Sequence, residues 1–201
     1  QSGVGKTLSG IGASYKNLGD YPKALTHFQQ SLAIHEKIGD INGIGNNLTN
    51  LGAVYDSLGQ FSQALKSYQQ ALQIQGNLGN ISGVAHNLSN MGLVYANQGL
   101  YPTALVHYQQ ALQIYRRLGD QRGIGQTLSN LGLAHKSLGN LPQALTLLNQ
   151  ALEIQRDLGD GRGEASTLTN LGMVYDTQGQ HSKALKHYLQ ALEMQRQIGD
   201  Q

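Results

Sequence analysis

The chain has 201 residues, of which 39% are hydrophobic and 13% charged, and its 14 basic and 12 acidic residues give a formal net charge of +2. A charge this small gives no field that collects phosphates, so we expect no nucleic-acid partner. The absence of cysteine excludes disulfides, thiolate metal sites and a cysteine nucleophile, and it suits the cytoplasm, where we expect the protein to act. Apolar runs are short and no signal-peptide pattern opens the chain, so we expect no membrane partner.

The sequence repeats itself every forty residues. The segment from Asn46, NNLTNLGAVYDSLGQFSQALKSYQQALQIQGNLGN, aligns without a gap with the segment from His86, HNLSNMGLVYANQGLYPTALVHYQQALQIYRRLGD. We therefore predict a single array over residues 1–201, with repeats at 1–40, 41–80, 81–120, 121–160 and 161–200. Because Gln201 would open a sixth repeat, we expect the chain to be a fragment of a longer protein.

Two amphipathic helices are predicted in each repeat. In the second repeat, apolar residues recur at helical spacing over residues 42–58, the predicted helix A, and again over residues 62–78, the predicted helix B. The turn between them is short, which predicts antiparallel packing. The other four repeats follow the same register along the chain.

Glycine, aspartate and proline mark where these helices end and begin. One glycine column follows helix A and another follows helix B, where a left-handed cap costs glycine least: Gly19, Gly39, Gly59, Gly79, Gly99, Gly119, Gly139, Gly159, Gly179 and Gly199. The residues directly after helix B offer oxygen acceptors that can cap the next helix A: Asp40, Asn80, Asp120 and Asp160. Pro22, Pro102 and Pro142 fall in the first turn of helix B, where a missing amide proton is harmless.

A glycine column in the middle of helix A predicts close contact with helix B. The column is Gly12, Gly52, Gly92, Gly132 and Gly172. A mid-helix glycine costs about 1 kcal/mol against alanine, so packing has to compensate. Large aromatic residues of both helices, such as Tyr55 and Tyr68, are expected to fill the space around that contact, whereas the fourth repeat has His135 and Leu148 instead.

The motif LxxLGxxY, followed by G and then ALxxYxxAL, resembles the tetratricopeptide repeat signature over essentially the whole chain. The forty-residue spacing is similar to long repeats of spindle-orientation adaptors, kinesin light chains and bacterial multidomain signalling proteins. The resemblance implies an all-α, right-handed superhelical solenoid of five antiparallel helix pairs. It also implies a concave wall, lined mainly by helix A, that binds a peptide or protein segment.

The helix A face opposite the apolar residues is the candidate wall. Its clearest feature is the column Asn50, Asn90, Asn130 and Asn170, which we call the asparagine ladder. Amide side chains both donate and accept, as recognition of a peptide backbone requires. The candidate peptide-binding residues are Asn46, Asn50, His86, Asn90, Leu93, Asn97, Asn130, Leu133, Asn170 and Met173. An alternative, left open by the sequence, is that the asparagines bond to neighbouring backbone or water, or persist from duplication.

Other functional classes find little support in the sequence. The opening SGVGKT resembles the end of a phosphate-binding loop, but it occupies the same repeat columns as GIGNN from Gly43, and no strand precedes it. The column His27, His107 and His187 is expected at the surface, too dispersed for a metal ion. We therefore predict no enzyme and no cofactor. The second functional hypothesis is a spacer or regulatory arm that self-associates end to end through uncapped terminal repeats.

Overall fold

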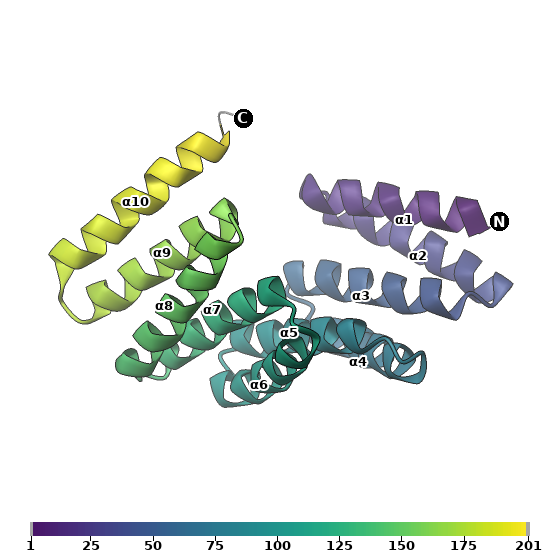
Figure 1. Ribbon diagram of the computed structural model, residues 1–201. Helices are drawn as coiled ribbons and strands as arrows, with labels where there is room; N and C mark the ends of the chain where they lie inside the picture. The colour runs from purple at the N-terminus through teal and green to yellow at the C-terminus, as the bar shows by residue number, and fades with distance from the viewer. Residues whose placement is uncertain (1, 200–201) are drawn as a thin grey trace. The chain divides into compact units, whose positions relative to one another are not determined.

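The computed structural model describes residues 2–199; Gln1, Asp200 and Gln201, which belong to the predicted array, lie outside the described residues. The described part of the chain contains ten α-helices and no strand (Figure 1). In chain order they are α1 (Ser2–Asn17), α2 (Tyr21–Ile38), α3 (Ile41–Ser57), α4 (Phe61–Asn77), α5 (Ile81–Asn97), α6 (Tyr101–Leu118), α7 (Gln121–Ser137), α8 (Leu141–Asp157), α9 (Gly161–Thr177) and α10 (His181–Gly199). In the second repeat the predicted boundaries differ from the observed ones by a single residue.

The helices fall into two compact units, Gln1–Gln98 and Gly99–Gln201. The first unit holds α1 to α5 and the second holds α6 to α10, and within each unit every helix packs against the next one along the chain. Four of the five predicted helix pairs lie inside one unit. Helices A of neighbouring repeats also touch, α1 with α3, α3 with α5, and α7 with α9. These contacts confirm the predicted all-α arrangement of stacked helix pairs.

The predicted caps are present at the helix ends. The side chains of Asp40, Asn80, Asp120 and Asp160 each accept a hydrogen bond from the backbone N–H three residues later, at 2.9 to 3.0 Å. Nine of the ten cap glycines have a positive φ, between 65° and 78°. Gly199 does not follow the prediction, because α10 continues through it. All three prolines lie in the first turn of a helix B.

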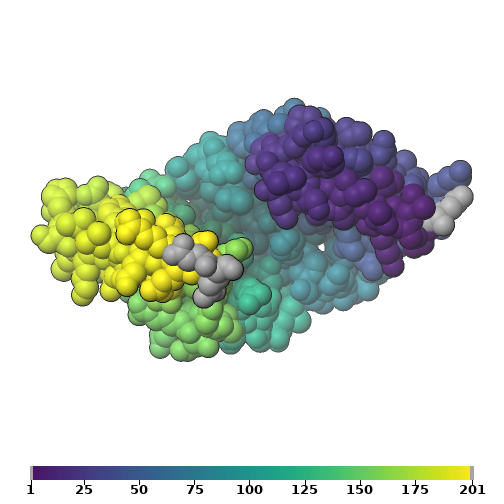
Figure 2. Space-filling view, turned by 90° about the horizontal axis from the view of Figure 1, so that it is seen from above, coloured from purple at the N-terminus to yellow at the C-terminus, as the bar shows by residue number. Residues whose placement is uncertain are grey.

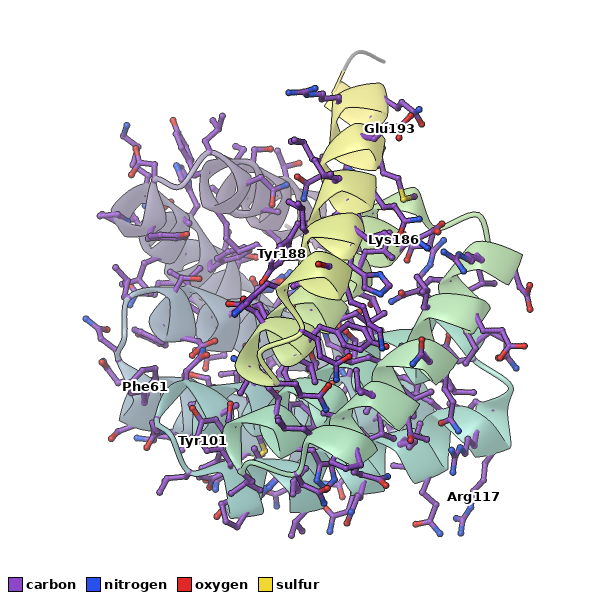
Figure 3. All side chains as sticks on the ribbon, turned by 90° about the vertical axis from the view of Figure 1, so that its left-hand side faces the viewer. Phe61, Tyr101, Arg117, Lys186, Tyr188 and Glu193 are labelled. Carbon is purple, nitrogen blue, oxygen red and sulfur yellow. The ribbon has the colours of Figure 1, made fainter. Side chains whose placement is uncertain are left out.

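The mid-helix glycines bring helix A against the large side chain of helix B. A Cβ atom added to Gly52 would lie 2.7 Å from the Tyr68 ring, and one added to Gly172 would lie 2.5 Å from Tyr188 of α10, which is labelled in Figure 3. In the fourth repeat Leu148 takes the place of the ring, 2.7 Å from the corresponding position of Gly132. The predicted close approach is therefore confirmed at these glycines.

The core of each unit lies between one helix B and the helices A on either side of it. In the first unit, buried Phe28 of α2 packs with Leu51 and Val54 of α3. In the second unit, buried Leu148 of α8 packs with Leu171 of α9. Each repeat thus buries its apolar face only by stacking on its neighbour, as in other repeat proteins. Among the described helices, none combines the length and the hydrophobicity that crossing a bilayer requires.

Candidate functional site

The candidate wall is the side of each helix A that turns away from the core. On α3, Leu51 and Val54 are buried, whereas Asn46 is exposed and Asn50 half-buried. The same alternation recurs on α5 and α7, whereas on α9 Ser166 is exposed and Asn170 is buried. Because α1, α3 and α5 touch in the first unit and α7 and α9 touch in the second, each unit presents its own stretch of wall.

In the first unit, a cavity of about 380 Å³ lies between α1 and α3; we call it the α1–α3 cavity. Lys6 and Ser9 come from α1, and Asn46, Asn47 and Asn50 come from α3. Its remaining lining includes two residues that lie between those helices along the chain, His35 and Asp40.

His35 and Asp40 form a hydrogen-bonded pair in this cavity. His35 is 2% exposed, and its Nδ1 lies 2.8 Å from Asp40 Oδ2. The other carboxylate oxygen, Oδ1, accepts the Gly43 N–H at 2.9 Å. That backbone N–H, together with His35 and the positive charge of Lys6, lowers the pKa of Asp40 below its ordinary value. The charged cap therefore also holds the His35 ring in place.

Between α3 and α5, polar side chains join one repeat to the next. Thr49 Oγ1 donates to Asn87 Oδ1 at 3.0 Å, and Asn87 Nδ2 donates to the Gly83 carbonyl at 2.9 Å. Near the end of both helices, Asn97 Nδ2 donates to Asp56 Oδ1 at 3.1 Å. Burial nevertheless raises the pKa of Asp56, because it outweighs that hydrogen bond.

Two candidate residues of α5, His86 and Leu93, stay open to a ligand. Leu93 is 41% exposed, which is high for a leucine inside a stack of helices. His86 is exposed and occupies the same repeat position as Asn46. Partial loss of solvation, followed by the charge of Lys16, lowers the pKa of the His86 imidazole, which favours its neutral form.

In the second unit, a cavity of about 380 Å³ lies between α7 and α9, and we call it the α7–α9 cavity. Asn170 is buried, and its Nδ2 donates to Ser129 Oγ at 3.1 Å. Ser129 Oγ is in turn 3.1 Å from Thr167 Oγ1. Gln155 joins this network when its amide nitrogen faces Thr167 Oγ1, 2.8 Å away. The polar groups on this side of the cavity are therefore used to hold the helices together.

The structure brings the predicted wall residues together only in part. Asn50, Asn90 and Asn130 are half-buried, and within residues 2–199 their side chains have no hydrogen-bond partner. Asn46 Oδ1 accepts from Gln75 Nε2 at 3.2 Å. Leu133 lines the α7–α9 cavity, and Met173 is half-buried on α9.

Two columns of buried side chains were not predicted from the sequence. The first is buried on helix A and consists of Asn47, Asn87, Thr127 and Thr167. The second is buried on helix B and consists of His35, Gln75, Tyr115 and Gln155. Their signal in the sequence is a polar residue at a fixed repeat position beside apolar ones. Burial also raises the pKa of Tyr115 to about 12, with the nearby charge of Asp120 adding to the effect.

The histidine column on helix B lies closer to the core than predicted. His27 is half-buried and stacks on Tyr15 of helix A, with ring centroids 5.4 Å apart. His187 stacks on Tyr175 in the same way, at 5.3 Å. In both repeats the histidine of helix B packs against a tyrosine of helix A in the same repeat, so these histidines form packing contacts. Across the described residues, no group of three His, Asp or Glu side chains is placed to hold a metal ion.

Comparisons with known proteins place these observations in context. A sequence model described as the tetratricopeptide repeat matches residues 3–76, 83–157 and 124–197. No curated protein matches the chain. Among solved structures, BtubC from P. vanneervenii is similar, with 23% identity, a TM-score of 0.79, and coverage of 98% of this chain and 82% of that one.

Two further solved structures share the fold. The TPR-like repeats of a putative kinesin light chain from Podosopora anserina have 18% identity and a TM-score of 0.74, over 98% of this chain and 96% of that one. The Rap conjugation gene regulator of the plasmid pLS20, in complex with the Phr* peptide, has 22% identity and a TM-score of 0.80. The match covers 94% of this chain but only 52% of the regulator.

Proposed function

Because the chain belongs to the tetratricopeptide repeat family, we propose that it is a protein-interaction scaffold that holds a peptide segment of a partner against its helix A wall. The observation that carries this proposal is the state of Asn50, Asn90 and Asn130. These half-buried amides have no hydrogen-bond partner among the described residues and recur at one repeat position. An amide offers a donor and an acceptor at once, which suits the backbone of an extended peptide.

The wall also offers apolar contacts beside these amides. A net hydrogen bond contributes about 0.5 to 1.5 kcal/mol, so a few amides alone do not reach micromolar affinity. Leu93, Leu133 and Met173 stand three residues after the ladder asparagines and are at least partly exposed. We assign Leu93 in the first unit, and Leu133 and Met173 in the second, the role of apolar anchors for a segment bound on the wall of their own unit.

The structural relatives support the same general role. The pLS20 Rap regulator was solved with a peptide bound, and its fold matches this chain closely, although the chain spans only about half of that protein. Identity of 22% carries the fold and not the ligand. The predictions that the protein acts in the cytoplasm and is not an enzyme stay predictions.

The test is to select peptides from a random library on the purified chain and to measure affinities by fluorescence anisotropy. The double variant Asn50→Ala with Asn90→Ala should weaken the selected peptides by about tenfold, the equivalent of losing 1.4 kcal/mol. The control variant changes Gln69 and Gln70, exposed residues of α4, to alanine and should bind like the wild type. Failure to select any peptide, or unchanged affinity in the double variant, would reject the proposed wall.

The exposure of α10 favours a second candidate function, that of a self-associating arm. On α10, Leu185 and Leu192 are 57% and 42% exposed, whereas the equivalent Leu152 of α8 is buried by α9. Figure 2 shows α1 and α10, in purple and yellow, at the surface of their units. We propose that α1 of a second copy covers α10, because its Val4 and Ile11 occupy the positions that other helices A use for this contact.

Sedimentation velocity tests this association. The sedimentation coefficient should rise with protein concentration in the wild type and stay constant in Leu185→Glu. A wild type that remains monomeric at high concentration would contradict the association and leave the peptide-binding proposal untouched.

A further inference from the structure

The third residue of every repeat is a glycine, and in four repeats it contacts the preceding helix B. These four glycines are Gly43, Gly83, Gly123 and Gly163. A Cβ atom added to Gly83 would lie 2.9 Å from Gln75 Cδ of α4, and one added to Gly123 would lie 2.5 Å from the Tyr115 ring of α6. Glycine at this position therefore lets a helix A pack closely on the helix B before it.

Helix α1 has the same glycine without the contact. Nothing among the described residues lies within 4 Å of the position that a Cβ of Gly3 would take. Thr7 Oγ1 donates to the Gly3 carbonyl at 3.0 Å. The equivalent bond on α7 joins Thr127 Oγ1 to the Gly123 carbonyl at 2.7 Å, but Thr127 is buried whereas Thr7 is exposed. The face of α1 that carries Gly3 and Thr7 thus resembles, in residues and local conformation, a face that is covered on α7.

Helix α10 shows the complementary difference. Gln195 is exposed, although the four other residues at its repeat position are buried. Those residues are His35, Gln75, Tyr115 and Gln155. Together with Ser166, Thr169 and Ile198, Gln195 lines a cavity of about 480 Å³ between α9 and α10, which we call the α9–α10 cavity.

The α7–α9 cavity shows how such a lining is completed. There, residues of α7 and α8 at the repeat positions of Ser166, Thr169 and Gln195 are joined by Gly163 and Thr167 of the next helix A. Within residues 2–199, the α9–α10 cavity has no helix A in that place. On α1, the two residues at the repeat positions of Gly163 and Thr167 are Gly3 and Thr7.

We propose that the α9–α10 cavity receives α1 of a second copy of the chain, with Gly3 against Gln195 and Thr7 against Thr169. This inference rests on the self-association proposed above, which places α1 on α10, and it assigns the register of the contact and the residues that the second copy contributes to the cavity.

Contacts inside the chain support this register. Thr169 and Thr7 hold the repeat positions of two pairs whose side chains lie within hydrogen-bond distance, at 3.0 and 3.1 Å. These pairs are Thr49 with Asn87, and Ser129 with Thr167. The proposed contact between two copies therefore repeats, side chain for side chain, a contact that each unit already makes.

The glycine requirement selects α1 as the occupant. A helix without this glycine would fit less well, because its Cβ would meet Gln195 as a Cβ added to Gly83 would meet Gln75. Among the described helices A, α1 alone has the glycine open, since those of α3, α5, α7 and α9 already contact a helix B. Because the contact uses α1 of one copy and α10 of the other, each pair keeps one free α1 and one free α10, and the association can continue.

Engineered disulfides test the register. The chain contains no cysteine, so a new disulfide has no background. One preparation carries Gly3→Cys and another carries Gln195→Cys, and the two are mixed under mild oxidation. The mixture should give a disulfide-linked dimer, because the two Cβ atoms would lie close enough for the bond. Each variant alone should give far less, since neither places two cysteines at the contact.

Gly10→Cys mixed with Gln195→Cys is the matched control. Gly10 also lies on α1 with nothing within 4 Å of its Cβ position, but it is seven residues, about 10 Å, further along the helix. This mixture should give at least tenfold less linked dimer than the mixture with Gly3→Cys.

Sedimentation velocity of two valine variants gives an independent measurement. Gly3→Val should weaken the association at least tenfold, because its side chain would meet Gln195 of the second copy. Gly10→Val should associate like the wild type, because the four other repeats accommodate an asparagine at that position. Both changes meet open space within the described chain, so both variants should keep the wild-type helicity.

Failure of the register and failure of the self-association can be distinguished. If the wild type associates but the Gly3 and Gln195 mixture links no better than the control, or Gly3→Val associates like the wild type, the register is wrong and the self-association stands. A wild type that stays monomeric at high concentration and gives no linked dimer would overturn both, and would leave the cavity to a helix of another protein.

Discussion

The contact between α1 and α3 and the contact between α7 and α9 involve the same repeat positions, but their polar side chains form different hydrogen bonds. Between α7 and α9, Asn170, Ser129 and Thr167 bond to one another, so the polar groups link two repeats. Between α1 and α3, Asn47 Oδ1 has no partner among residues 2–199, although the cavity there has about the same volume. Duplicated repeats can thus share a fold while differing in which of their buried polar groups are hydrogen-bonded.

The difference traces to a few side chains on a common backbone. Ser9 and Ser129 hold the same position on the first helix A of each pair, and Asn50 and Asn170 hold the same position on the second. The residue that differs is Asn47 of α3, which stands where α9 has Thr167, the partner of Ser129. The hydrogen bonds of each contact thus follow from single substitutions, not from a change of fold.

The largest expected effect concerns the glycines that both units share. Gly52→Ala should destabilise the protein by about 2 kcal/mol, because its Cβ would lie 2.7 Å from the Tyr68 ring and overpacking outweighs the helix propensity of alanine. The matched change Gly10→Ala meets no atom within 4 Å and should stabilise the protein by about 0.5 to 1 kcal/mol. Urea unfolding followed by circular dichroism measures both changes, and equal effects would show that helix propensity alone governs both positions.

A smaller effect separates the ladder asparagines from one another. Asn170→Ala should cost about 1 to 2 kcal/mol, because it removes a buried partner of Ser129. Asn50→Ala should change stability by less than about 0.5 kcal/mol, because no intramolecular bond is lost within the described residues. Thermal unfolding of the two variants gives the comparison. Equal losses of stability would contradict the expectation and show that the two asparagines make equivalent contacts.

Local chemistry explains what the sequence predicts well. The cap at Asp40, the left-handed Gly59 and the first-turn Pro22 each depend on a few neighbouring residues, and all three appear as expected. The one cap glycine that departs is Gly199, which remains helical. The close approach at Gly52 was also predictable, because the glycine and Tyr68 recur together in the repeat.

Contacts between repeats were harder to predict. Whether Asn170 faces a ligand or Ser129 depends on how α7 and α9 lie against each other, and the period alone does not contain that geometry. Asn46 and Asn47 are adjacent in sequence, yet the first is exposed and the second is buried. For the same reason, the role of His35 as part of a cavity appears only once α1 and α3 are placed side by side.

The smallest expected effect is a pH dependence of the free energy of unfolding, to which histidines of both units contribute. Loss of solvation lowers the pKa of His135 on α7, of His187 on α10 and of His86 on α5, where the charge of Lys16 adds to the effect. In the unfolded chain these groups take up protons as pH falls through about 6.5, whereas the folded protein resists charging them. The unfolded state then binds more protons, so the free energy of unfolding decreases from pH 6.5 down to the lower folded pKa values.

His135→Tyr isolates one contribution to this slope, because tyrosine holds the position in the other four repeats, as Tyr55 does in the second. The wild type should lose melting temperature between pH of about 8 and about 5.5, on either side of the ordinary histidine pKa. The variant should lose less over the same interval, and its melting temperature at the higher pH provides the baseline for any change in packing. A loss in the variant as large as that in the wild type would mean that His135 titrates alike in the folded and unfolded chains, and that the acid sensitivity originates elsewhere.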